Sequence, residues 1–331
     1  MQYFLGVDIG SVSSNFVLLD YNQEVKAKVY LRTNGHPVNA IREGYLALRN
    51  TMPQDARIAG VGATGSGRHL ADIMLGADVV KNEITTHAVA ACHYDPACQT
   101  VIEIGGQDSK IIILRDGIVH DFAMNTVCAA GTGSFLDQQA ARLGLPIEHL
   151  GEQALASTRP VRIAGRCGVF AESDMIHKQQ MGYPMSDILM GLCEALVRNY
   201  LNNVGKGKKI LSPVVFQGGV AANRGIRKAF EKALALPVAV PRHHDVMGAV
   251  GAAILAREET AQKMKNSRFR GDDFVLEGDF QTRSLDCQGC PNLCEVACIM
   301  RDREVLAYWG DRCRKWDTSL KPAAQEQAVV G

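Results

Sequence analysis

The sequence predicts an α/β protein of two lobes built on a duplicated core. Residues 3–19 have the pattern of an apolar strand, a small polar turn and a second apolar strand. The same unit recurs at residues 101–114, which indicates an internal duplication. A third apolar strand at 213–217 ends on two glycines and precedes a basic helix. Strands that alternate with helical stretches are typical of α/β folds.

Four helical stretches are expected between and after these strands. They lie at residues 37–52, 66–75, 186–204 and 245–262. The third is the clearest, because apolar residues recur along one face. Its apolar stripe comprises Leu189, Leu192, Leu196 and Tyr200. Ser186 and Asp187 are expected to cap this helix at its N-terminus.

The chain length of 331 residues agrees with two domains and an appendage, at roughly 100–200 residues per domain. Charged residues and a glycine at 268–273 predict a linker. The expected parts are a first lobe of residues 1–97 plus 245–264, a second lobe of residues 98–244, a cysteine-rich module at 274–317 and a loose tail at 318–331.

Composition narrows the class of protein. A formal net charge of +1 gives no support for a nucleic-acid partner. No run of 18 apolar residues predicts a membrane span, and the first residues lack the pattern of a signal peptide. We therefore expect a cytoplasmic protein. Ten cysteines in a reducing compartment favour metal or redox chemistry over disulfides.

Three turns, each directly after an apolar strand, carry the chemistry of a phosphate site. Glycine lets the backbone approach an anion, and N–H groups and serine hydroxyls can bind phosphate. Carboxylates there can hold Mg²⁺ through water. One such turn alone is an ordinary hairpin, but three together are hard to assign to chance. The residues are Asp8, Gly10, Ser11, Val12, Ser13 and Ser14; Gly105, Gly106, Gln107 and Asp108; and Gln217, Gly218, Gly219 and Asn223.

These turns resemble the motifs of a known superfamily. GVDIGSVSS, IGGQDSK and VVFQGGVAANRG are similar to the two phosphate motifs and the adenosine motif of the actin/Hsp70/sugar-kinase ATPases. The resemblance covers about residues 3–262 and implies ATP or ADP, with Mg²⁺, in a cleft between two lobes. It assigns Asp8 and Asp108 to Mg²⁺ and water, and Glu83 to the attacking water. A P-loop and a dinucleotide-binding fingerprint are absent from the sequence.

Cys128 and Cys167 each precede a small-residue turn and a predicted helix. The N–H groups and positive dipole end of a helix N-terminus favour a thiolate or an anionic cluster. Two cysteines cannot complete a four-thiolate [4Fe–4S] site in one chain, but a two-fold dimer can. The alternative is two ordinary buried cysteines.

The segments around these cysteines carry a second resemblance. CAAGTGSF and AGRCGVFAESD are similar to the cluster-binding segments of activators of 2-hydroxyacyl-CoA dehydratases. That ATPase family includes ATPase subunits of benzoyl-CoA reductases and reductases of double-cubane cluster proteins. The resemblance implies an oxygen-sensitive homodimer in which Cys128 and Cys167 of both copies hold one [4Fe–4S] cluster. It also implies that the protein hydrolyses ATP and passes single electrons to a dehydratase, a benzoyl-CoA reductase-like enzyme or a double-cubane cluster protein. The electron donor would be a ferredoxin or a flavodoxin.

A kinase of a sugar or other small metabolite, from the same superfamily, remains the alternative. A kinase would account for the nucleotide loops but not for the paired cysteines. A slow ATPase without redox chemistry, acting as an interaction protein, is a third possibility.

The C-terminal module has a dense group of cysteines. A tetrahedral metal site could form from Cys287, Cys290, Cys294 and Cys313. Cys298 could instead be the fourth ligand. Zinc would stabilise the module, a second cluster would relay electrons, and no metal at all also stays open. The spacing differs from the bacterial ferredoxin pattern. This extension departs from the shorter activators, so a fused or larger dehydratase-like partner is as well supported as a classical dehydratase.

Overall fold

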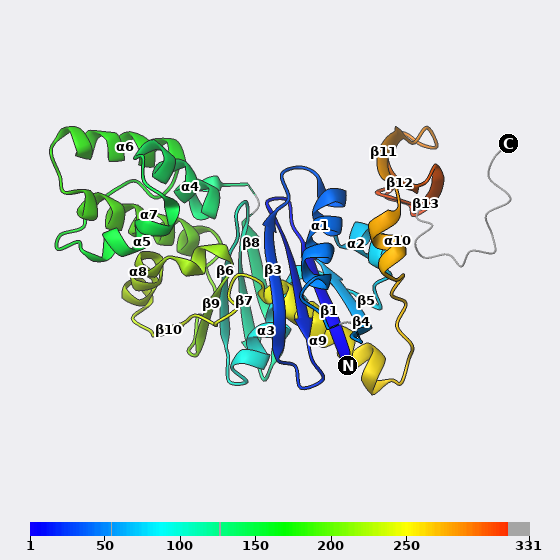
Figure 1. Ribbon diagram of the computed structural model, residues 1–331. Coiled ribbons are helices and arrows are strands. Elements are labelled where there is room, and N and C mark those ends of the chain that lie inside the picture. The colour runs from blue at the N-terminus through cyan, green and yellow to red at the C-terminus, as the bar shows by residue number, and fades with distance from the viewer. Residues whose placement is uncertain (54, 126, 317–331) are drawn as a thin grey trace.

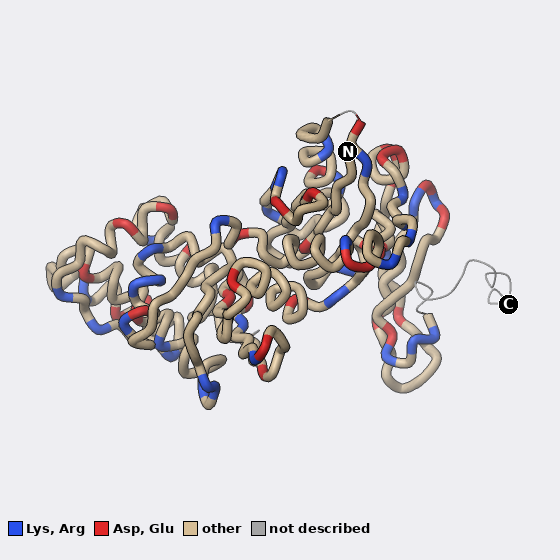
Figure 2. The backbone as a smooth tube through the Cα atoms, turned by 90° about the horizontal axis from the view of Figure 1, so that it is seen from below, with Lys and Arg blue, Asp and Glu red and all other residues tan. Residues whose placement is uncertain are grey.

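The computed structural model describes residues 1–53, 55–125 and 127–316 (Figure 1). The predicted tail at 318–331 lies outside these residues. Two five-stranded sheets lie side by side in the middle of the molecule, and a three-stranded sheet lies at one end. Lys and Arg are interspersed with Asp and Glu along the backbone (Figure 2). None of the described helices is long and apolar enough to cross a membrane.

The first sheet has the strand order β3-β2-β1-β4-β5. Its strands are β1 (Gln2–Ile9), β2 (Ser13–Leu19), β3 (Val25–Arg32), β4 (Arg57–Thr64) and β5 (Val79–Val80). Side chains alternate between its faces, as in any strand. Leu5 and Val7 face α1 (Pro37–Arg49) and α2 (Arg68–Leu75), whereas Phe4 faces α9 (Met247–Arg257). Helix α3 (Glu83–Tyr94) packs beside α9 on that second face.

The second sheet repeats this connectivity, with the order β10-β9-β6-β7-β8. Its strands are β6 (Thr100–Ile104), β7 (Ser109–Arg115), β8 (Ile118–Asn125), β9 (Val214–Gln217) and β10 (Val238–Ala239). In both sheets an antiparallel three-stranded meander precedes a strand that pairs in parallel with the first strand of the meander. The predicted duplication of the core is therefore confirmed.

The helices of the second lobe surround one long central helix. They are α4 (Gly133–Arg142), α5 (Ile147–Leu155), α6 (Gly168–Gln180), α7 (Met185–Asn203) and α8 (Arg224–Leu234), with short 3₁₀ turns at η1 (Ala129–Gly131) and η2 (Gly219–Ala222). The predicted stripe of α7 is fully buried in the core of this lobe. The helix is where the apolar pattern predicts it.

The predicted capping of α7 is wrong. The helix begins directly after Pro184, so Ser186 and Asp187 fall within its first turn. The Asp187 carboxylate instead accepts hydrogen bonds from the Ser157 hydroxyl at 2.6 Å and from the backbone N–H of Thr158 at 3.1 Å. These bonds lower the pKa of Asp187. Asp187 therefore holds the preceding loop against α7.

The C-terminal module packs against the first lobe. It consists of α10 (Asp272–Glu277) and an antiparallel meander of β11 (Phe280–Asp286), β12 (Glu295–Arg301) and β13 (Glu304–Trp309). Val275 and Ile299 are buried in the same core as α1 and α2. The expected linker at 268–273 is thus not a free connection, because Asp272 accepts hydrogen bonds from Tyr45 and from Arg49 Nε.

Candidate functional site

A cleft of about 130 Å³ lies between the two sheets, and residues of both lobes line it. The turns that follow β1, β6 and β9 meet there. Of the residues predicted for a nucleotide site, the cleft gathers Asp8, Gly10, Ser11, Val12, Ser13, Glu83, Gly105, Gly106, Gln107, Asp108, Gly218 and Gly219. Residues from four distant parts of the sequence therefore share one cavity.

Three residues of the same prediction do not line this cleft. Ser14 is buried and its hydroxyl shares a hydrogen bond with that of Thr33 at 2.9 Å. Asn223 caps α8, because its Oδ1 accepts the N–H of Ile226. The Gln217 amide is buried and its Nε2 lies 2.8 Å from Nδ1 of His87. The polar atoms of these three side chains make hydrogen bonds within the protein.

The first two turns contact each other across the cleft. The Ser11 hydroxyl donates to Oε1 of Gln107 at 2.7 Å. Gly106 lies so close to Val12 that a Cβ on it would come within 2.8 Å of the valine side chain. Backbone without side chains can thus approach a ligand from both lobes.

Gly248 brings the start of α9 against Asp8. A Cβ at this position would lie 2.1 Å from Asp8 Oδ2 and 3.3 Å from Nε2 of His87. A side chain at position 248 would therefore displace the Asp8 carboxylate from its position in the cleft. The third turn has its own glycine requirement, since Gly218 has φ +91°.

Acidic groups from both lobes face the cleft. Burial raises the pKa of Asp8 from 3.8 to about 7, and Glu83 and Asp108 raise it further, against the opposing effect of Lys110. Hard carboxylate oxygens are the ligands that Mg²⁺ takes in proteins. Asp8, Glu83 and Asp108 therefore offer the type of ligand atom that a divalent cation takes, although their side chains are not grouped into a ready three-ligand site in the described part of the chain. A bound cation would offset the cost of keeping these partly buried carboxylates charged.

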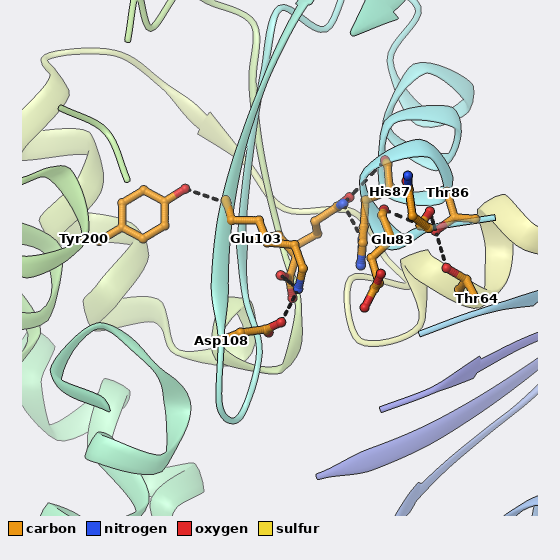
Figure 3. Close-up of polar contacts among 10 residues, drawn as sticks. Thr64, Glu83, Thr86, His87, Glu103, Asp108 and Tyr200 are labelled. Carbon is orange, nitrogen blue, oxygen red and sulfur yellow. Dashed lines mark hydrogen bonds and ion pairs between the residues drawn. The ribbon is translucent and has the colours of Figure 1, made fainter. Parts of the chain in front are cut away.

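Sequence reasoning did not single out the buried ion pair behind these carboxylates (Figure 3). Lys110 Nζ lies 3.0 Å from Glu103 Oε2 and 2.8 Å from Asp108 Oδ2. Burial raises the pKa of Glu103 to about 7, although Lys110 opposes this. Burial alone would lower the pKa of Lys110, but Glu103 and Asp108 hold it above its ordinary value. The sequence does contain a signal for this ion pair, because Glu103 and Lys110 are charged residues within otherwise apolar strands.

His87 connects the two lobes at the base of the cleft. It lies on α3 and its ring nitrogen Nδ1 contacts the Gln217 amide of β9 (Figure 3). Burial lowers the pKa of His87 to about 3, and Lys110 contributes. The ring is therefore neutral at physiological pH, and Nδ1 is free to accept the amide N–H.

Cys128 and Cys167 lie in neighbouring loops of the second lobe. Cys128 precedes η1 and α4, and Cys167 is the N-cap residue of α6. The amide Nδ2 of Asn199 on α7 lies 3.8 Å from Cys128 Sγ, and it donates to the carbonyl oxygens of Gly165 at 2.7 Å and Arg166 at 3.4 Å. Both cysteines are partly exposed. One side chain thus touches both cysteine loops.

Exposed apolar side chains lie close in sequence to these two cysteines. The exposed fractions are 95% for Val127, 71% for Val169 and 66% for Phe170. Each is next to or within three residues of one of the two cysteines. Cys167 lies at the N-terminus of α6, whereas Cys128 precedes only the three-residue turn η1, and α4 begins after Thr132. Two partly exposed thiols beside exposed apolar side chains could bind a metal that is shared with a second protein surface.

Cys287, Cys290 and Cys294 lie in or beside the connection between β11 and β12, Cys298 lies within β12, and Cys313 follows β13. The module and α6 occupy opposite ends of the molecule (Figure 1). The N–H of Cys287 donates to the carbonyl of Cys294 at 2.8 Å. The Gly289 N–H and the Trp316 indole lower the pKa of Cys287, whereas burial raises that of Cys298. Cys290 and Cys313 are exposed. Over the described ranges, no three His, Cys, Asp or Glu side chains are grouped to hold a metal ion.

The profile of the BadF/BadG/BcrA/BcrD ATPase family matches residues 5–256. The chain belongs to this family. It is 36% identical to the (R)-2-hydroxyglutaryl-CoA dehydratase activating ATPase of Acidaminococcus fermentans, over 78% of this chain and 99% of the relative. It is 32% identical to the 2-hydroxyisocaproyl-CoA dehydratase activator of Clostridioides difficile, over 80% of this chain and 98% of the relative.

Solved structures agree with this assignment. The crystal structure of component A of the A. fermentans dehydratase aligns with a TM-score of 0.72 and 35% identity, over 79% of this chain and all of that one. The C. difficile activator with bound ADPNP aligns with a TM-score of 0.71 and 32% identity, over 79% and 97%. A xylulose kinase, at 10% identity and a TM-score of 0.50, shares the fold alone. The predicted actin/Hsp70/sugar-kinase fold is confirmed.

Proposed function

We propose that this protein is an ATP-dependent one-electron donor that activates a partner enzyme. Two copies would hold one [4Fe–4S] cluster through Cys128 and Cys167 of each. The observation that carries the proposal is the single Asn199 amide that contacts Cys128 Sγ and the loop before Cys167. A bound cluster would supply reversible one-electron transfer, with a potential set by its surroundings.

We assign ATP and ADP binding to the cleft between the lobes. The turns at Gly10–Ser13 and Gly105–Gln107 would receive the phosphates, with Asp8 and Asp108 directed to Mg²⁺ and Glu83 to the attacking water. Lys110 fixes the Asp108 carboxylate through its 2.8 Å contact. Mg²⁺, when bound, would neutralise phosphate charge.

The apolar surface at Val127, Val169 and Phe170 supports the homodimer. A second copy related by a two-fold axis would cover this surface and contribute the same two thiols. Exposed apolar groups around a partly exposed thiol pair are otherwise costly in water. This arrangement supplies four sulfur ligands without any further cysteine.

The names of the relatives support a dehydratase-type electron acceptor. The two quoted above are described as activators of acyl-CoA dehydratases. A benzoyl-CoA reductase-like enzyme or a double-cubane cluster protein remains within the proposal, as does a ferredoxin or flavodoxin donor. We place the protein in the cytoplasm of an anaerobic cell. The C-terminal cysteines stay a proposed second metal site.

Anaerobic purification tests the cluster. The wild type should be a brown dimer with about four irons per dimer, and Cys128→Ala should abolish both colour and iron. Cys92→Ser, at a partly exposed cysteine of α3, is the matched control and should keep both. A colourless, monomeric wild type after cluster reconstitution would contradict the proposal. ATP consumption that requires a sugar acceptor would favour the kinase alternative.

A further inference from the structure

Helix α7 contacts a residue that lines the nucleotide cleft, and both cysteine loops, through two consecutive residues. The buried Tyr200 hydroxyl donates to the carbonyl oxygen of Lys110 at 2.7 Å (Figure 3). Lys110 is the residue whose ammonium bridges Glu103 and Asp108. Asn199, one residue earlier, is the side chain that contacts both cysteine loops.

Helical geometry explains how one turn of α7 contacts both the Lys110 carbonyl and the cysteine loops. Consecutive residues of an α-helix point about 100° apart, so Tyr200 and Asn199 face different neighbours. The ring of Tyr200 packs edge-on against Phe230 with ring centroids 5.3 Å apart. Most of α7 is buried in the core of the second lobe. A displacement at one contact would therefore move the helix as a body, because packed interiors do not deform locally at low cost.

The amide of Asn199 is held in one orientation. Its Oδ1 accepts a hydrogen bond from Nδ2 of Asn203 at 2.8 Å, while its Nδ2 faces two carbonyl oxygens that can only accept. Gly131 closes the other side, where a Cβ would come within 2.7 Å of Asn199 Oδ1. The Nδ2 group is therefore fixed toward the cysteine loops.

We propose that α7 transmits the nucleotide state of the cleft to the cysteine pair, with Tyr200 and Asn199 as its two positioning residues. A change at the carboxylates shifts Lys110, the Tyr200 contact carries this shift to α7, and Asn199 changes its distance to the Cys128 and Cys167 loops. The biological role of this coupling rests on the proposed function. The coupling itself should also exist in the protein without a bound cluster.

The coupling can be measured on the cluster-free, full-length protein. Alkylation of Cys128 and Cys167 by iodoacetamide is followed by mass spectrometry at saturating ADP and at saturating ADPNP. The exposed Cys290 of the C-terminal module is the reference thiol in the same sample. In the wild type the two nucleotides should give rates that differ at least threefold at Cys128, with no difference at Cys290.

Tyr200→Phe and Asn199→Leu should each bring this rate ratio to within 1.5 of unity. Tyr45→Phe is the matched control, because it removes another tyrosine hydroxyl that bonds to Asp272 in the first lobe. It should keep the wild-type ratio.

An unchanged ratio in either folded variant would overturn the proposal. So would a wild type in which the nucleotides leave both the alkylation rates and the amide hydrogen exchange of α7 unaltered, a result that needs no variant. Iron content and colour of the wild type decide the proposed function separately, so the two can fail independently.

Discussion

Asp8→Asn should make the nucleotide-free protein more stable at alkaline pH, although it removes a residue assigned to Mg²⁺. The Asp8 carboxyl lines the cleft and is largely removed from water, which raises its pKa from 3.8 to about 7. The folded protein therefore holds this proton more tightly than the unfolded chain does. Consequently the wild type loses stability as the pH rises from about 4 to about 7, and the loss is complete above that interval.

The expected size follows from this pKa. At 1.36 kcal/mol per tenfold change in proton affinity, the full cost is about 4 kcal/mol, most of it incurred above pH 5. Asn has nearly the same shape and does not titrate. The difference in free energy of unfolding between variant and wild type should thus grow in favour of the variant by about 2–3 kcal/mol from pH 5 to pH 8.

Urea unfolding of both proteins at pH 5 and pH 8, without nucleotide or Mg²⁺, measures this difference. Asp55→Asn is the control, because Asp55 is an exposed carboxylate whose side chain is 73% accessible. Its difference from wild type should stay within about 0.5 kcal/mol at both pH values. ATP hydrolysis by Asp8→Asn should fall by roughly a hundredfold. A stability difference that does not change with pH would refute the reasoning about burial.

Two further changes test the buried ion pair and the C-terminal cysteines. Lys110→Met should cost about 3–5 kcal/mol, because it leaves Glu103 buried without its partner. The loss should be smaller at pH 5 than at pH 8 by urea unfolding, since Glu103, with a pKa of about 7, takes up a proton at the lower pH; equal losses would contradict this. Cys287→Ser combined with Cys290→Ser should remove about one metal site per chain by zinc and iron analysis, and unchanged metal content would exclude the proposed second site.

Local patterns were sufficient to predict the hairpins and the turns that line the cleft. An apolar strand that ends on Asp8, or on Gly218, is readable from a few neighbouring residues. The cleft then forms because the duplicated sheets bring equivalent strand ends together. The role of Asn223 as the N-cap of α8 could also be predicted from the sequence, since Asn before a helix is a common N-cap. The resemblance to an adenosine motif led instead to a ligand role.

Other features depend on contacts that no local pattern contains. Lys110 looks like a surface residue until its side of the sheet is known to face Glu103. Asn199 is an ordinary polar position within a helix, and its importance comes from Cys128, 71 residues away. The docking of the C-terminal module likewise depends on Asp272 meeting Arg49 across 223 residues.

Charge across the cleft supplies a physical basis for the proposed effect of nucleotide on the protein. Asp8 belongs to the first sheet and Asp108 and Glu103 to the second. Across the gap, Asp108 raises the pKa of Asp8, and Asp8 raises the pKa of Glu103. Without a cation these carboxylates favour separation or protonation, and Lys110 offsets only part of that cost. A divalent cation with phosphates would reverse the balance and draw the lobes together. Lys110 contacts these carboxylates through its ammonium and α7 through its backbone carbonyl, which accepts the Tyr200 hydroxyl, so the residue exposed to this reversal is also bonded to α7.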